Sequence, residues 1–443
     1  KEKYNEYISI VADELNNYHN INMSKLYWER VIGLFVLMHI HHTRYIFNFF
    51  KKLNSSEYSI NLLEKSCYII PEITEEYRSI IQHSNFGYEQ LVAEYFGLFG
   101  KKFDFHFHYY DKVFNRKIAY YKPDIGLIKR IASKNIIEIS ISSILKITRN
   151  LFRATIKPKI LLVETIFKPS KYLSLMLRSL GKIQFINNFA IEHPSFDVNK
   201  IKRKKLFESI DKDLTEYDQY FFQSLKTLMP KSWLENYNVR KKTVQNLLNK
   251  NDTLKYIVSE TSLETTQFLI SEAKEKKIKY IFNEHNWLQH QWHGNHIWFL
   301  TSICDEYFSL GWVDKNNKKI IPKGSLFRWQ IPKNKIDISI LYVASHCNSK
   351  MIHLELSHGE SGSDNIETYI NMNKLFFNAL GENILEKIYY RSHPHSSSDH
   401  YVDYSLKDKD VFPEYINKFS YVDSNLSTRA EKLMSRSKII VVN

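Results

Sequence analysis

The feature that most constrains this sequence is a strand, helix and strand pattern between residues 255 and 283. Residues 255–258 and 279–283 are rich in β-branched and aromatic side chains, and residues 262–276 between them have the length and polarity of a surface helix. This spacing predicts a βαβ unit, in which the two strands lie parallel in one sheet. The sequence therefore predicts a chain of the α/β class.

The same alternation continues on both sides of this unit. Further strands are predicted at 159–163, 182–186, 305–310, 336–343 and 387–390, with helices at 171–180 and 367–380 and more α/β pattern at 415–442. Residues 322–332, bounded by two prolines, are predicted to connect two α/β series. We therefore expect two Rossmann-like lobes facing a cleft, with ligands outside the carboxyl ends of the strands.

The first part of the chain has a helical pattern instead. Residues 4–50 and 58–98 are predicted to be helical, and His39, His41 and His42 with Arg44 are expected at a helix end, where positive charge suits the dipole. The predicted domains are 1–330, with a helical region at 1–98 and an α/β region at 99–330, and 331–443. The last residues read as an interrupted strand, so we expect the sequence to be truncated at both ends.

Composition limits the classes of partner and location. The chain has 443 residues, a formal net charge of +14 and three cysteines without CxxC spacing. The cysteines are expected to be reduced thiols in a cytoplasmic protein. The positive charge favours anionic partners, including the cytoplasmic face of the inner membrane. The alternative is that a biased composition scatters lysines over the surface, which would give the same net charge without any such partner. No nucleic-acid motif is present, so no specific nucleic acid is expected.

A first candidate site follows the predicted strand 279–283. Glu284 is a candidate general base, and His285 could orient a substrate or stabilise phosphate charge. The next loop is rich in histidine and includes His290 as a substrate-binding candidate; a plain surface loop is the alternative. Three of its histidines recur at every third position, but no further ligand completes a tetrahedral site, so no metal is expected.

A second candidate site follows the predicted strand 387–390. Arg391 can bind a phosphate through two parallel hydrogen bonds, and Pro394 restricts His393 to a defined extended or turn form. His393 could then protonate or hydrogen-bond a leaving phosphate, with Ser396 as a further donor. A capped loop without function is the alternative.

A third candidate is the glycine- and serine-rich segment 356–363. Ser357, Gly359 and Ser361 could bind an anion through backbone N–H groups. The segment lacks the lysine spacing of a P-loop, so it does not indicate an ATPase. A loop without a ligand is equally compatible with this composition.

Several short motifs are spread along the chain: Leu15-Asn16 with His19, Tyr27-Trp28, Ile32-Gly33, Arg44, Pro230 with Trp233-Leu234-Glu235, Phe308 with Gly311-Trp312, and Lys319 with Pro322. Together they resemble a family of transferases encoded in bacterial surface-polysaccharide loci. The resemblance departs from the family pattern at Leu34-Phe35, where the family has Pro-Trp, and around Glu284, where only His285 matches a Gln-His-Gly-Gly loop. It implies a transferase and makes Arg44 a substrate-binding candidate.

His393-Pro394 also resembles the His-Pro motif of bacterial sialyltransferases and Kdo transferases of the GT-B type. That resemblance implies a GT-B fold, a CMP-activated ulosonic or nonulosonic acid as donor, a glycan or lipid-linked glycan as acceptor, and no cofactor. The acidic motif of those enzymes has two candidates here, Glu284 and Glu260. We therefore expect a metal-independent inverting glycosyltransferase; a non-catalytic sugar-nucleotide-binding or assembly protein of the same pathway is the alternative.

Overall fold

The computed structural model describes most of the chain. The described residues are 1–52, 59–82, 86–103, 105–113, 148, 152, 155–164, 169–186, 197–208, 210, 213–260, 263–284, 295–323, 335–344, 347–348, 366–392, 405–406, 408–422 and 430–442. The chain divides into two compact units, the first made of Lys1–Ile81, Asn85–Tyr121 and Gly126–Leu326, the second of Gln82–Ser84, Lys122–Ile125 and Phe327–Asn443.

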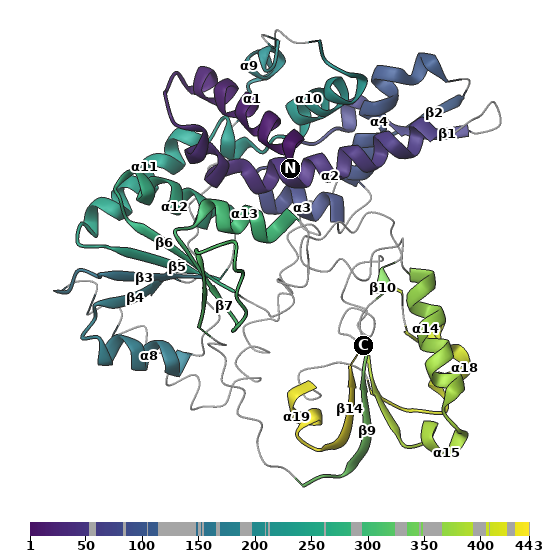
Figure 1. The fold of residues 1–443 in the computed structure, drawn as a ribbon. Helices are drawn as coiled ribbons and strands as arrows, with labels where there is room; N and C mark the ends of the chain where they lie inside the picture. Colours follow the sequence, from purple (N-terminus) through teal and green to yellow (C-terminus); the bar gives the residue numbers. More distant parts are fainter. Residues whose placement is uncertain are drawn as a thin grey trace. The chain divides into compact units, whose positions relative to one another are not determined.

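The first unit contains a six-stranded sheet in which every neighbouring pair is parallel (Figure 1). Its strands are β3 (Ile160–Val163), β4 (Ile183–Ile186), β5 (Tyr256–Ser259), β6 (Lys279–Asn283), β7 (Glu306–Ser309) and β8 (Ile320–Pro322), in the order β4-β3-β5-β6-β7-β8. The predicted α/β class is confirmed. The direction of strand progression reverses between β3 and β5, which is a topological switch point.

Helices cover this sheet on both faces. A thick layer built around α2 lies on one face, and α8 lies on the other (Figure 1). The helices of the unit are α1 (Glu2–His19), α2 (Lys25–Lys52), α3 (Thr74–Gln82), α4 (Phe86–Phe99), α8 (Pro169–Arg178), α9 (Lys200–Lys205), α10 (Glu216–Leu228), α11 (Tyr237–Lys250), α12 (Glu264–Glu275) and α13 (Asn295–Ile303), with short 3-10 turns η1 (Lys65–Cys67), η2 (Gly100–Lys102) and η3 (Lys231–Trp233).

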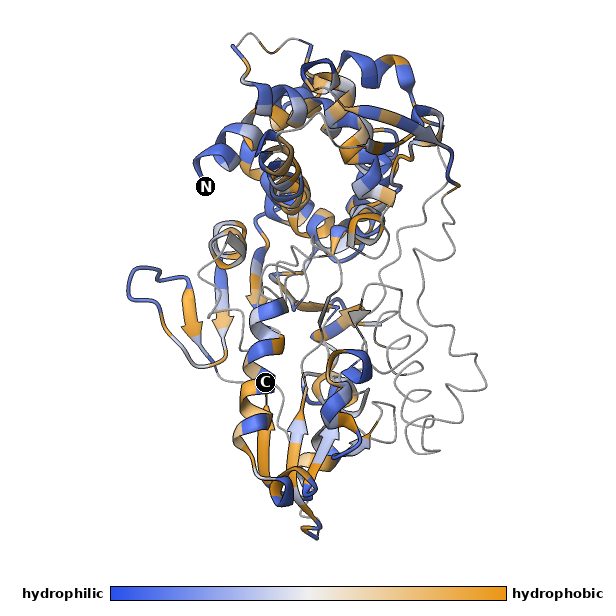
Figure 2. Cartoon of the chain, turned by 90° about the vertical axis from the view of Figure 1, so that its right-hand side faces the viewer, coloured by the Kyte–Doolittle hydropathy of each residue, from blue (hydrophilic) through white to orange (hydrophobic). Residues whose placement is uncertain are grey.

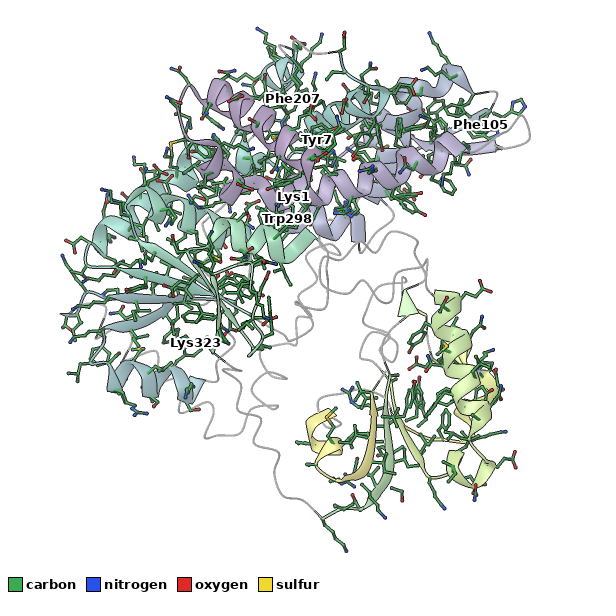
Figure 3. The ribbon with its side chains drawn as sticks, viewed as in Figure 1. Lys1, Tyr7, Phe105, Phe207, Trp298 and Lys323 are labelled. Atoms are coloured by element: carbon green, nitrogen blue, oxygen red, sulfur yellow. The ribbon has the colours of Figure 1, made fainter. Side chains whose placement is uncertain are left out.

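Aromatic side chains join the helices of this layer. Tyr7 of α1 stacks on Phe221 of α10 with ring centroids 4.2 Å apart, and both rings are fully buried. Lys1 lies beside Trp298 of α13, with Nζ 5.7 Å from the ring centroid (Figure 3). Such contacts bury large apolar areas and fix the helices against one another.

The expectation of continuous helix at 58–98 was wrong at its start. Residues Ser59–Leu63 form β1, which pairs in parallel with β2 (His106–Tyr110). Only the last two residues of β1 are buried, so the strand carries little of the apolar periodicity that sequence prediction uses. Both histidines of β2, His106 and His108, are exposed on the surface.

The histidines of α2 were also predicted in the wrong setting. The helix continues to Lys52, so His39 and His42 lie within it rather than at its end, and both are fully buried. His39 Nδ1 lies 3.0 Å from the Tyr77 hydroxyl and Nε2 lies 2.9 Å from Ser224 Oγ. Burial lowers the pKa of His39 to about 3, so the ring is neutral and carries no charge for the dipole.

The second unit has a smaller sheet, also parallel throughout. Its strands are β9 (Ile338–Val343), β11 (Ile388–Arg391), β13 (Ser420–Val422) and β14 (Ser437–Val442), in the order β13-β11-β9-β14. A separate two-stranded antiparallel sheet is formed by β10 (Cys347–Asn348) and β12 (Ser405–Leu406). The described helices of this unit are α14 (Ile366–Ala379), α15 (Glu382–Leu385), α17 (Asp408–Val411), α18 (Pro413–Ile416) and α19 (Ala430–Met434).

The core of the second unit is aromatic. Phe377 of α14 is fully buried among rings from β11 and α18, and Tyr390 stacks on Phe419 with centroids 5.3 Å apart. Hydrophobic residues gather along the strands in Figure 2. Within the described residues, no helix combines the length and the apolar content that crossing a membrane requires.

Candidate active site at the strand ends

The carboxyl ends of β3, β5 and β6 bring polar side chains into one row. Val163 pairs with Ser259, and Ser259 pairs with Phe282, so the next residues of the three strands are Glu164, Glu260 and Asn283. Neighbouring strands lie about 4.8 Å apart, which places these residues side by side. Because β3 and β5 flank the switch point, this is the edge where open α/β sheets bind ligands.

Glu284 follows Asn283 and is 1% exposed. Its Oε2 accepts hydrogen bonds from the backbone N–H of Leu310 at 2.7 Å and from Trp312 Nε1 at 2.8 Å. Ser309 Oγ donates to the Trp312 carbonyl, and Gly311 between them has φ +118°, which favours glycine. The Glu284 carboxylate therefore holds the turn that leaves β7.

Glu260 lies one strand closer to the switch point and is 2% exposed. The Asn283 side-chain amide donates to Glu260 Oε1 at 3.3 Å and also to the Glu284 carbonyl at 3.3 Å. Asn283 thus links the two acidic residues that the sequence singled out as alternatives for a base. The structure brings both candidates to one sheet edge.

Sequence analysis missed Glu164, the second carboxylate of this row beside Glu260. It follows β3 directly, has φ +49°, and its Oε2 accepts a 2.7 Å hydrogen bond from Thr266 Oγ1 on α12. A left-handed backbone at a glutamate is uncommon outside turns. The sequence did contain a sign of this site, because Glu164 directly follows the apolar strand 160–163. The same pattern, an acidic residue directly after a predicted strand, identified Glu284.

A buried ion pair fixes the start of α12 beside these strand ends. Arg240 Nη1 donates to Glu264 Oε1, and both side chains are at most 1% exposed. Glu264 Oε2 also accepts from the backbone N–H of Thr74 at 2.6 Å and from Ser232 Oγ at 2.9 Å. The helix that follows β5 is therefore tied to α3, η3 and α11.

The second unit presents Arg391 at the end of β11. Arg391 is 8% exposed, and its carbonyl accepts a 3.0 Å hydrogen bond from the Ala344 N–H after β9. Ser392 is fully buried, and its N–H donates to the Val422 carbonyl at 3.2 Å. The strand order of this sheet places a second switch point between β9 and β14, and β9 separates that point from β11.

The other predicted site residues fall in different places. Arg44 is exposed on α2. Burial raises the pKa of Tyr217 on α10 to about 12, and the Arg44 charge partly opposes that rise, so Arg44 belongs to the helical layer. Eight predictions lie outside the described residues: His285, His290, Ser357, Gly359, Ser361, His393, Pro394 and Ser396. Among the residues that are described, no group of three or more His, Cys, Asp or Glu is arranged to hold a metal ion.

The amino-terminal motifs have structural partners instead. Asn16 Oδ1 accepts from the Met23 N–H and from Trp28 Nε1, both at 2.9 Å. His19 Nε2 donates to the Trp233 carbonyl at 2.8 Å, which requires the tautomer protonated at that nitrogen. These contacts join α1, α2 and η3, so helix packing accounts for the spacing of the motif.

A comparison with curated proteins finds no match. A family model described as "LIC12162 family transferase" matches residues 1–443. The transferase that the motifs suggested is thereby confirmed at the level of the family: this chain belongs to the LIC12162 family of transferases.

Proposed function

We propose that this transferase is a glycosyltransferase of surface-polysaccharide or glycoconjugate biosynthesis. In this proposal the two units are the lobes of a GT-B enzyme, the donor is a CMP-activated ulosonic or nonulosonic acid, and the acceptor is a glycan or lipid-linked glycan. The enzyme works in the cytoplasm, at the inner membrane when the acceptor is lipid-linked. The observation that carries the proposal is the row of polar side chains at the first switch point, Glu164, Glu260 and Asn283.

This row, with its two carboxylates and one amide, suits an acceptor with several hydroxyl groups. Each carboxylate oxygen can accept a hydrogen bond from a sugar hydroxyl, whereas it would repel a phosphate. The nucleotide is therefore assigned to the second unit, where Arg391 ends β11, the neighbour of the strand β9 that flanks the second switch point. This division gives each unit one substrate.

The contacts favour Glu260 over Glu284 as the general base. Two N–H groups already converge on Glu284 Oε2 and hold the turn after β7, so moving this carboxylate would disturb that turn. Glu260 lies beside the switch point, where the acceptor is expected. In the proposed reaction Glu260 removes the proton of an acceptor hydroxyl as its oxygen attacks the anomeric carbon.

The bond between the anomeric carbon and the CMP phosphate breaks in the same step. The leaving phosphate takes up negative charge, which Arg391 and His393 would stabilise where it develops. Attack from the face opposite the leaving group inverts the anomeric configuration. No metal is needed for this step, because the cationic side chains stabilise the negative charge of the leaving phosphate.

Nucleotide binding tests the donor half of the proposal. CMP should raise the melting temperature of the protein, while UDP and GDP should raise it less. Arg391→Ala should remove the CMP shift, and Lys387→Ala is the matched control, because Lys387 is exposed at the amino end of the same strand. An unchanged CMP shift in Arg391→Ala would contradict the assignment of the nucleotide.

Turnover tests the acceptor half. With a CMP-activated donor, Glu260→Gln should lower kcat by roughly 10²–10⁴-fold while the CMP shift is kept, because a base acts only in the chemical step. Glu275→Gln, an exposed substitution on α12, should leave kcat unchanged. CMP binding with no transfer by the wild-type protein to any glycan acceptor would favour the non-catalytic alternative instead.

A further inference from the structure

The first unit carries a short surface helix composed almost entirely of cations. α9 has the sequence Lys-Ile-Lys-Arg-Lys-Lys, and its four lysines are exposed. Like charges three and four positions apart destabilise an isolated helix. Some other contact must therefore hold this segment in helical form.

A buried ion pair supplies that contact. Arg203 Nε and Nη2 each donate to a different oxygen of Glu235 at 2.7 Å, and both side chains are 5% exposed. Arg203 Nη1 also donates to the Met229 carbonyl at 2.8 Å. The side chain of Asn199 caps the helix by accepting from the Lys202 N–H at 3.0 Å.

The same anchor fixes which side chains point outward. Arg203 faces inward, and Phe207 just beyond the helix is buried against Phe222 at 5.0 Å between centroids (Figure 3). Successive residues of a helix turn by about 100°. Ile201 and Lys205 therefore lie on the side opposite Arg203, and Ile201 is 74% exposed.

Other cations extend this surface, which we call the α9 surface. Lys202 Nζ lies 5.0 Å from the centroid of Tyr18 on α1, and Lys226 Nζ lies 3.4 Å from the Lys204 carbonyl. Glu14 and Glu208 act electrostatically on Lys226. The α9 surface, formed by Ile201 and Lys200, Lys202, Lys204, Lys205 and Lys226, has more cations than these acids can neutralise.

We propose that the α9 surface docks the protein on an anionic phospholipid membrane. Ile201 enters the boundary between headgroups and acyl chains, and the surrounding lysines bind headgroup phosphates. An aliphatic side chain at the centre of the exposed face gains nothing from a nucleic-acid backbone, which is why a lipid surface is the better fit. The proposal uses no residue of the transfer reaction and does not depend on the proposed function.

Vesicle co-sedimentation tests this proposal with the full chain. Wild-type protein should sediment with phosphatidylcholine vesicles that contain phosphatidylglycerol and stay in solution with pure phosphatidylcholine. Exchanging the four α9 lysines for glutamine should weaken binding by about fivefold for each lysine. The control exchanges four exposed lysines from two other turns of the same unit, Lys276, Lys277, Lys315 and Lys318, for glutamine. This control has the same change of net charge and should bind nearly as well as wild type.

Ile201→Ser separates membrane insertion from charge alone. It should weaken vesicle binding and leave binding to heparin, a polyanion without an apolar layer, unchanged. Equal losses in the α9 and control variants would overturn the proposal, because total charge would then explain binding. Binding to duplex DNA but not to anionic vesicles, lost in the α9 variant, would overturn it in favour of a nucleic-acid surface. Circular dichroism of each variant verifies that it is folded.

Discussion

The buried histidine of α2 makes the helical layer sensitive to acid. His39 is fully buried, and burial lowers its pKa to about 3. An exposed histidine in the unfolded chain has a pKa of about 6.5. Between these two values the unfolded chain binds a proton that the folded protein does not, so the free energy of unfolding falls as the pH decreases below about 6.5.

The size of this effect follows from the two pKa values. The stabilisation is complete above the unfolded-state pKa and decreases by about 1.4 kcal/mol for each pH unit below it. At about pH 5 the contribution of His39 is therefore roughly 2 kcal/mol less than at about pH 7.5. That is a large part of the stability of an ordinary domain.

His39→Phe should remove the part of this dependence that comes from His39 while keeping a ring at the site. The exchange costs stability at every pH, because Tyr77 and Ser224 each lose a hydrogen-bond partner. Tyr77 keeps its 3.1 Å contact with His42 Nδ1, and Ser224 keeps its 3.1 Å bond to the Phe221 carbonyl, so the loss is limited.

Hydrogen exchange of the α2 amides provides the assay, because it reports the opening of this helix separately from the second unit. After correction for the intrinsic exchange rate, the opening free energy of wild-type α2 should fall by about 2 kcal/mol more than that of His39→Phe between about pH 7.5 and pH 5, because burial also lowers the pKa of His41 on this helix. His39→Phe should show a clearly smaller fall, and His106→Gln, an exposed control on β2, should behave as wild type. Identical pH dependence in His39→Phe and wild type would refute the reasoning.

Three further predictions concern stability and reactivity. Arg240→Met should destabilise the first unit by about 3–5 kcal/mol in urea unfolding, because the Glu264 carboxylate loses its buried cation, and adding Glu264→Gln should restore part of the loss. Gly33→Ala should cost about 1–3 kcal/mol, measured the same way, because the new methyl would lie 2.7 Å from the Phe299 ring in a closely packed site. Iodoacetamide should leave Cys304 unmodified in the native protein, because burial raises its pKa to about 12, whereas the half-buried Cys67 should react; mass spectrometry distinguishes them.

The strands of both sheets could be predicted because they carry their signal locally. A parallel strand buried on both faces is a short apolar run, and residues 279–283 form β6 with the predicted bounds. β1 could not be predicted, because its stability comes from pairing with β2, more than 40 residues later in the chain. The burial of His39 likewise depends on Tyr77 and Ser224, which no local pattern links to α2.

The candidate site, like the fold, could be predicted from the sequence only in part. A glutamate after a strand indicated Glu284 and its neighbourhood, because the carboxyl ends of parallel strands lie at one edge. The sequence did not indicate what Glu284 binds, because Leu310 and Trp312 lie in the turn after a different strand. The choice between Glu260 and Glu284 as base therefore needed three-dimensional contacts.

That choice leads to a prediction about Glu284 that does not require a substrate. If its carboxylate holds the turn after β7, Glu284 and Trp312 must stabilise the fold jointly. A double-mutant cycle with Glu284→Met and Trp312→Phe, measured by urea unfolding, should give a coupling energy of about 1–3 kcal/mol, as expected for a buried hydrogen bond to a charged group. The matched pair Glu260→Met and Trp312→Phe should give additive effects. A coupling near zero for Glu284 would mean that the carboxylate is not committed to the turn, and it would then compete with Glu260 for the role of base.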